Sequence, residues 1–274
     1  MSFENLFRQV LNIPSIPKVV QELINNFNDS NTSARDIAQK LQMDQTLSVK
    51  VLRLANSARY GCGRKINSID AAVITLGFDA LKTLVIASGL TAACKSIPGL
   101  NQKQFWRTSF SVANLTKMFA KLSGRDGEVA YTCGLLHNIG DTLLFLTHKE
   151  QMANIEVMCA TGADRATLQQ SQFGCDFTDV GAELARRWNF PEEICLAIAY
   201  QQKPEQCPSP NTYPLLLHLA IHLHDDLSSG KKPAEAVAHL PKEKAADLNI
   251  DTLQLLEQLT YLLNKEDDIE SFIN

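Results

Sequence analysis

Paired cysteines, blocks of basic residues and long charge-free hydrophobic runs are all missing from this sequence of 274 residues. The closest of its seven cysteines, Cys195 and Cys207, are twelve positions apart, so no CxxC pair for zinc or redox chemistry is present. We interpret the cysteines as reduced, mostly buried thiols of a cytosolic protein, because disulfides are rare in that compartment.

Clustered positive charge is also lacking, and the formal net charge is -4 at pH 7. Nucleic-acid binding requires Lys and Arg gathered against phosphates, so we expect no nucleic-acid partner. The longest charge-free run, residues 206–224, contains three prolines and three histidines, which argues against a membrane-spanning helix. The first ten residues lack the apolar core of a signal peptide. We therefore expect a cytoplasmic protein that does not contact membranes.

Alternation of polar and apolar residues with a period of two, which is typical of β-strands, is not found between turn signals. Apolar residues recur instead every three to four positions, as at Val19, Leu23 and Phe27, and again between Phe105 and Phe119. The chain is 45% hydrophobic and 20% charged, as in ordinary globular proteins. The sequence predicts an all-α fold.

Helix starts and breaks divide this helical pattern. Ser33 and Asp36 form a predicted capping box at the start of one helix. Residues 97–99 (IPG) break the chain after the first helices, and the proline-rich segment 204–214 breaks it again. We expect two packed helical lobes followed by a C-terminal helical extension, at residues 5–96, 100–210 and 211–274.

Short motifs follow one another along the first three quarters of the chain. In the first lobe they are residues 13–17 (IPSIP), 44–47 (DQTL), 52–57 (LRLANS), 68–69 (SI) and 76–77 (LG). In the second lobe they are residues 105–106 (FW), 134–140 (GLLHNIG), 180–184 (VGAEL) and 188–194 (WNFPEEI). Taken in this order, over residues 5–210, they resemble the HDOD domain (HD-related output domain) of bacterial signalling proteins.

The resemblance implies a multi-helical fold related to the HD metal-dependent phosphohydrolases. It also implies a role in bacterial signal transduction, with other signalling proteins as partners. In active HD proteins a divalent metal lowers the pKa of a bound water that attacks phosphorus. Several imidazole and carboxylate ligands must converge on that metal.

The His-Asp pair that gives HD proteins their name corresponds by resemblance to His137 and Asn138. The histidine is kept, but the carboxylate has become a neutral amide, which adds no charge and bridges two metal ions poorly. We interpret both as vestigial positions. A hydrogen-bonded interior histidine and an asparagine that satisfies nearby backbone groups are the structural alternatives.

The other ligand positions implied by the family carry side chains that bind metal ions weakly or not at all. These substituted positions are Thr108, Phe177, Gln201 and Gln202. One imidazole and an amide hold a catalytic divalent ion poorly, so we expect no cofactor and no catalytic residue.

A second group of possible metal ligands lies on a predicted helix near the C-terminal end. His218, His222 and Asp225 follow at i, i+4 and i+7, so they share one helix face. Two histidines at i and i+4 can chelate zinc, although the HExxH pattern is absent. The competing interpretation is a polar helix face beside a core stripe.

A helix in the first lobe carries a possible contact surface, made of Asp44, Lys50, Arg53, Asn56 and Ser57. One interpretation is a polar network that docks the first lobe on the second. The other is a surface for a protein partner or an anionic ligand.

Six leucines between positions 253 and 263 give the last helix a broad apolar face. This face either packs on the main domain or contacts a second copy of the chain, and we expect the packing within the chain. For the protein we expect a non-catalytic regulatory or scaffold role through protein contacts. The alternatives are a phosphohydrolase with a degenerate or relocated site, and a sensor of a small ligand such as a nucleotide.

Overall fold

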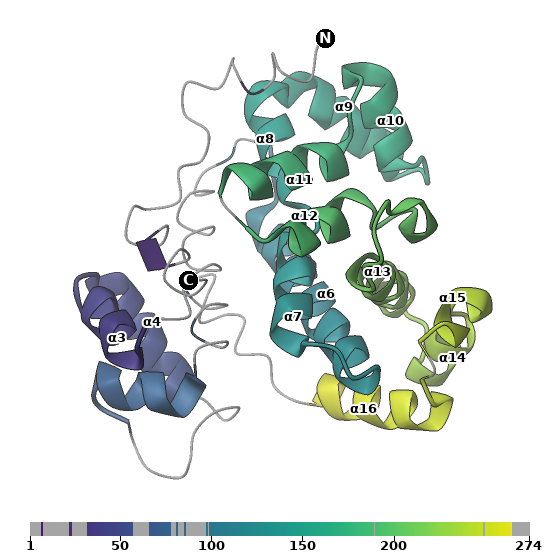
Figure 1. The fold of residues 1–274 in the computed structure, drawn as a ribbon. Coiled ribbons are helices and arrows are strands. Elements are labelled where there is room, and N and C mark those ends of the chain that lie inside the picture. Colours follow the sequence, from purple (N-terminus) through teal and green to yellow (C-terminus); the bar gives the residue numbers. More distant parts are fainter. Residues whose placement is uncertain are drawn as a thin grey trace. The chain divides into compact units, whose positions relative to one another are not determined.

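The fold is described from a computed structural model. The structure describes residues 7, 22–23, 32–56, 66–77, 81, 85, 97, 99–188, 190–248 and 250–264. Throughout these residues the regular secondary structure is helical, with no strand, which confirms the predicted all-α fold (Figure 1).

The chain divides into two compact units. One contains residues 1–13 and 96–267, and the other contains residues 14–95 and 268–274. The boundary predicted at residues 97–99 lies next to this division. The boundary predicted between residues 210 and 211 lies inside the larger unit.

In the smaller unit, helix α3 (Ala34–Gln42) is followed directly by α4 (Gln45–Ala55). Ser33 and Asp36 form the predicted capping box, and each side chain accepts a hydrogen bond from the other's backbone N–H. Asn56 follows α4 and pairs with the backbone of Ile66, whose N–H donates to Oδ1 at 2.8 Å and whose carbonyl accepts from Nδ2 at 2.7 Å.

The centre of the larger unit is the pair α6 (Gln102–Leu122) and α7 (Gly127–Leu136), which lie side by side (Figure 1). Gly134 allows this close approach. A Cβ atom there would lie 2.5 Å from the Cα atom of Ala113, so a larger side chain would force the two helices apart.

Helix α8 (Ile139–Thr147) packs against α11 (Phe177–Arg187) in the same close manner. A Cβ atom on Gly140 would lie 2.0 Å from the carbonyl oxygen of Phe177. The neighbouring helices are α9 (Lys149–Cys159), α10 (Arg165–Phe173), α12 (Glu192–Ala199) and the 3₁₀ helix η1 (Pro204–Gln206). His137 and Asn138 directly precede α8 in the chain.

The C-terminal helices pack on this core. Helix α13 (Tyr213–Ser228) contacts α6, α7 and α12, and α16 (Thr252–Asn264) contacts α6 and α14. Leu255 and Leu259 of α16 are buried, whereas Leu253 and Leu263 are exposed, so only part of the leucine face packs within the chain. The two short helices between them are α14 (Pro233–Ala238) and α15 (Lys242–Ala246).

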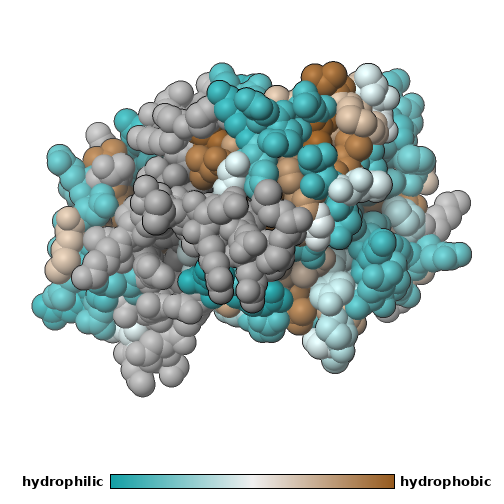
Figure 2. Space-filling model, turned by 90° about the horizontal axis from the view of Figure 1, so that it is seen from above, coloured by the Kyte–Doolittle hydropathy of each residue, from teal (hydrophilic) through white to brown (hydrophobic). Residues whose placement is uncertain are grey.

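Polar residues cover much of the described surface when the molecule is viewed from above, with smaller hydrophobic patches between them (Figure 2). None of the helices in the described ranges combines the length and the hydrophobicity needed to cross a membrane.

Candidate functional site

His137 and Asn138 form the junction between α7 and α8, with His137 at the C-cap of the first helix and Asn138 at the N-cap of the second. The His137 ring is buried, and its Nδ1 lies 2.7 Å from the carbonyl oxygen of Gly134. A carbonyl only accepts hydrogen bonds, so Nδ1 carries the proton and Nε2 the lone pair. Burial lowers the pKa of His137 to about 4, with a smaller contribution from nearby His224. The imidazole is therefore neutral at pH 7.

The Asn138 side chain is held by Ser109 of α6. The buried hydroxyl of Ser109 lies 2.9 Å from Oδ1 of Asn138 and also 2.9 Å from the carbonyl oxygen of Phe105. A hydroxyl has one proton, so it donates to one of these oxygens at a time. The amide thus takes part in a neutral hydrogen bond that joins α6 to the junction of α7 and α8.

Thr108, predicted to stand at the first ligand position, is not the α6 residue that meets Asn138. Its hydroxyl lies 3.5 Å from the side-chain amide of Gln104, one turn earlier on the same helix. Successive side chains on an α-helix point about 100° apart. The side chain on α6 that faces Asn138 is therefore that of the next residue, Ser109.

Of the remaining substituted positions, the structure brings only Gln201 to His137. Gln201 is buried, and its Nε2 donates to the carbonyl oxygens of His137 and Ile198, each at 2.8 Å. Gln202 is exposed. Phe177 is the first residue of α11, where its N–H donates to Oε1 of Gln169 at 2.8 Å.

A histidine that the sequence analysis did not assign to this site also contributes. Nδ1 of His224 on α13 lies 2.8 Å from the hydroxyl of Ser111 on α6. Burial lowers the pKa of His224, as it does for His137. Contact between α6 and α13 brings these side chains together, and the sequence offers no local signal for such a pairing.

The carboxylate nearest in sequence to the junction is Asp141, and it already has partners. Its Oδ1 accepts from Gln169 at 2.7 Å, and its Oδ2 lies 3.4 Å from a guanidinium nitrogen of Arg165. Burial raises the pKa of Asp141, and Arg165 and Gln169 oppose that rise. The groups gathered at His137 and Asn138 are thus the imidazoles of His137 and His224, amides and hydroxyls, and the described carboxylate of Asp141 is paired elsewhere. This donor set does not fit a catalytic divalent metal.

The predicted ligand group His218, His222 and Asp225 is not assembled. Nδ1 of His218 lies 2.9 Å from the carbonyl oxygen of Gln201, and its Nε2 lies 3.3 Å from Nζ of Lys244. Among the described residues, His222 is grouped instead with Asp226 and with His239, which follows α14.

Two of the residues predicted to form a contact surface are used locally. Asp44 accepts a hydrogen bond from the N–H of Leu47 at 3.0 Å at the start of α4, and Asn56 holds Ile66. Lys50 is half-buried and Arg53 is exposed, while Ser57 lies outside the described residues.

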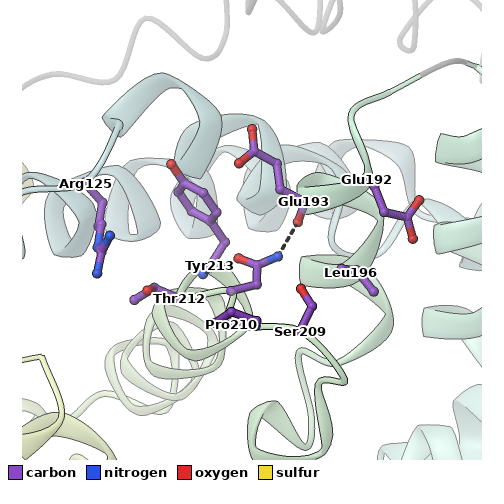
Figure 3. A pocket seen from close by; sticks show the side chains of 9 residues that line it. Arg125, Glu192, Glu193, Leu196, Ser209, Pro210, Thr212 and Tyr213 are labelled. Atoms are coloured by element: carbon purple, nitrogen blue, oxygen red, sulfur yellow. Dashed lines mark hydrogen bonds between the residues drawn. The ribbon is translucent and has the colours of Figure 1, made fainter.

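An open pocket of about 370 Å³ lies elsewhere in the larger unit, lined in part by the start of α12 and the segment leading into α13 (Figure 3). Nδ2 of Asn211 donates to the carbonyl oxygen of Glu193 at 2.9 Å. Burial, together with the nearby Glu193 and Asp126, raises the pKa of Tyr213 to about 12. Arg125 faces the same space as two glutamates, so the lining carries both signs of charge. His137 and Asn138 do not line this pocket.

Among solved structures, this chain is similar to a protein from Shewanella amazonensis SB2B called "Putative phosphohydrolase". The TM-score is 0.84, with 30% identity over 98% of both chains. An HDOD domain protein of unknown function from Geobacter sulfurreducens has the same fold, with a TM-score of 0.77 and 24% identity over 98% of this chain and 96% of that one.

Two uncharacterised bacterial proteins are similar in sequence. One, from Treponema pallidum (strain Nichols), is 26% identical over 72% of this chain and 39% of its own length. The other, YuxH of Bacillus subtilis (strain 168), is 26% identical over 47% of this chain and 31% of its own length. This chain therefore spans well under half the length of either relative.

The helical fold and the similarity to the Shewanella protein define an HD-related helical protein. The model of the HDOD domain family matches residues 13–204, and this chain belongs to that family.

Proposed function

We propose that this chain is a non-catalytic HDOD regulatory module that acts in bacterial signal transduction through protein contacts. The observation that supports this proposal best is the hydrogen bond between Ser109 and Asn138. By resemblance Asn138 corresponds to a metal-binding carboxylate, and this bond would fill that position with a pair of neutral groups. A neutral imidazole at His137 adds one ligand, whereas HD chemistry needs several imidazoles and carboxylates around each metal.

A phosphohydrolase is the second candidate. It is favoured by the retained His137 and by the 30% identity to the Shewanella protein. The two functions differ in whether turnover depends on His137.

The test uses purified protein supplied with Mn²⁺, Fe²⁺, Mg²⁺ or Zn²⁺ and a panel of phosphomonoesters, phosphodiesters and cyclic dinucleotides. We expect the same background rate for the native chain and for His137→Gln, which keeps a hydrogen-bonding side chain in the buried position. Metal-dependent turnover that His137→Gln abolishes would sink the proposal. His148→Gln is the matched control, because His148 is also buried and lies outside the site.

The regulatory half of the proposal needs a test in cells. In the source bacterium, we expect a chain with His137→Gln to restore the transcript profile of a strain that lacks the protein. A chain that folds, as judged by its melting temperature, but fails to restore that profile would contradict a role independent of HD chemistry.

A further inference from the structure

Three potential metal ligands meet where α13 and α14 come together. His222 and Asp226 are one turn apart on α13, and His239 follows the last residue of α14. One ligand atom from each lies within 4.8 Å of those of the other two. The rings of His222 and His239 are stacked, with centroids 5.4 Å apart and an angle of 24° between their planes.

A cation already lies among these groups, namely the ammonium of Lys231. Its Nζ is 2.5 Å from Oδ1 of Asp226 and 3.0 Å from Nδ1 of His239. The same Nδ1 lies 2.7 Å from Oδ2 of Asp226. Because Nδ1 of a neutral ring either donates or accepts, it can satisfy the carboxylate or the ammonium, but not both. A carboxylate and an imidazole nitrogen thus face one positive charge. The same two ligand types also bind metal cations.

We propose that His222, Asp226 and His239 form a zinc-class metal site and that the Lys231 ammonium holds the place of the ion in its absence. Two imidazoles and one carboxylate are a ligand set that Zn²⁺ accepts, with water as the fourth ligand. In a tetrahedral site with bonds of about 2.1 Å, ligand atoms lie about 3.4 Å apart. The group must therefore close by no more than roughly 1.4 Å.

The elements that carry the ligands can make this closure. Asp226 is buried in α13, which packs on the core, whereas His239 is 58% exposed at the end of a six-residue helix. Binding requires Lys231 to leave, and its partly exposed side chain can turn toward water. A bound ion would fasten α14 to α13 and thereby hold the turn at residues 228–233 in place. The site shares no residue with the His137 junction, so it is independent of the proposed regulatory function.

The first measurement is calorimetric titration of the intact chain with ZnCl₂ in a buffer that does not bind zinc. We expect one zinc per chain and a rise in melting temperature with zinc concentration, since an ion that binds only the folded state stabilises it. His222→Gln is the decisive variant, because the bonds among Asp226, Lys231 and His239 remain intact in it. Changes outside the ligand set can cost roughly 10- to 100-fold in metal affinity, so loss of a ligand should cost at least that much. The matched control is His218→Gln on the same helix, which should bind zinc like the native chain.

The second measurement tests the place of Lys231. Lys231→Met removes the competing ammonium, so zinc should bind roughly tenfold or more tightly, with Lys232→Met as the control that changes nothing. Absence of zinc binding in both the native chain and Lys231→Met would overturn the proposal. So would unchanged binding in His222→Gln. Zinc binding should also be the same in His137→Gln, so failure of this proposal and failure of the proposed function give different results.

Discussion

The hydroxyl of Ser109 lies 2.9 Å from the side-chain oxygen of Asn138, and this contact joins α6 to the junction of α7 and α8. Both partners lie in the larger unit, and Ser109 is fully buried. The contact is a hydrogen bond between a hydroxyl and an amide, so neither partner carries a charge.

Ser109→Ala should destabilise the protein, because it leaves the Asn138 oxygen without its partner. We expect a loss of about 1–3 kcal/mol in the free energy of unfolding, measured by urea denaturation. Thr108→Ala is the control, since that hydroxyl is only half-buried and its contact is long, and it should change stability by less than about 0.5 kcal/mol. Equal effects of the two variants would mean that the Ser109 contact does not stabilise the fold.

Gly140→Ala should be one of the most damaging single-methyl changes in the chain. The added Cβ would lie 2.0 Å from the carbonyl oxygen of Phe177, and backbone atoms cannot rotate away as a side chain can. We expect a loss of about 3 kcal/mol or more, or failure to fold. Gly127→Ala is the comparison, because its Cβ would meet only the flexible side chains of Lys117 and Lys121, and its effect should stay within about 1 kcal/mol. Melting curves decide between these outcomes.

Acid should destabilise the protein through His137. The pKa of His137 is lowered from 6.5 to about 4 in the folded state, so the unfolded chain binds the proton more tightly. The resulting loss in the free energy of unfolding is absent above pH 7 and grows as the pH falls below 6.5. It reaches about 2 kcal/mol near pH 5.

The measurement compares urea unfolding at pH 7 and pH 5 for the native chain and for His137→Gln. Between pH 7 and pH 5 the native chain should lose about 2 kcal/mol more in the free energy of unfolding than the variant does. The effects of the other titrating groups largely cancel in this comparison. His224 is the exception, since its charge acts on His137. Equal losses would show that His137 does not titrate in this range.

Arg165→Met should destabilise the protein, because the buried carboxylate of Asp141 loses the positive charge that offsets its burial. Arg165 pairs with Asp141 at 3.4 Å and with Glu156 at 2.6 Å, and its removal leaves a buried carboxylate without its cation. We expect a loss of about 2 kcal/mol or more, reduced in the double variant with Asp141→Asn. Arg186→Met, which removes two ion pairs of an exposed arginine, with Glu183 and with Glu192, should cost less than about 1 kcal/mol. Thermal unfolding of these three variants and of Asp141→Asn alone tests this, and additive effects would rule out coupling between Asp141 and Arg165.

Local patterns in the sequence were sufficient for the helical fold, the capping box at Ser33 and the HDOD family. These depend on residues three or four positions apart, or on a motif read in order, and neighbouring residues determine them. The tertiary structure alone decided that Ser109 rather than Thr108 meets Asn138, because one residue turns a side chain by about 100° around α6. It also decided that His222 meets Asp226 and His239 rather than His218 and Asp225. That grouping depends on how α14 folds back on α13 across the turn at residues 228–233, and no periodicity in the sequence encodes such a return.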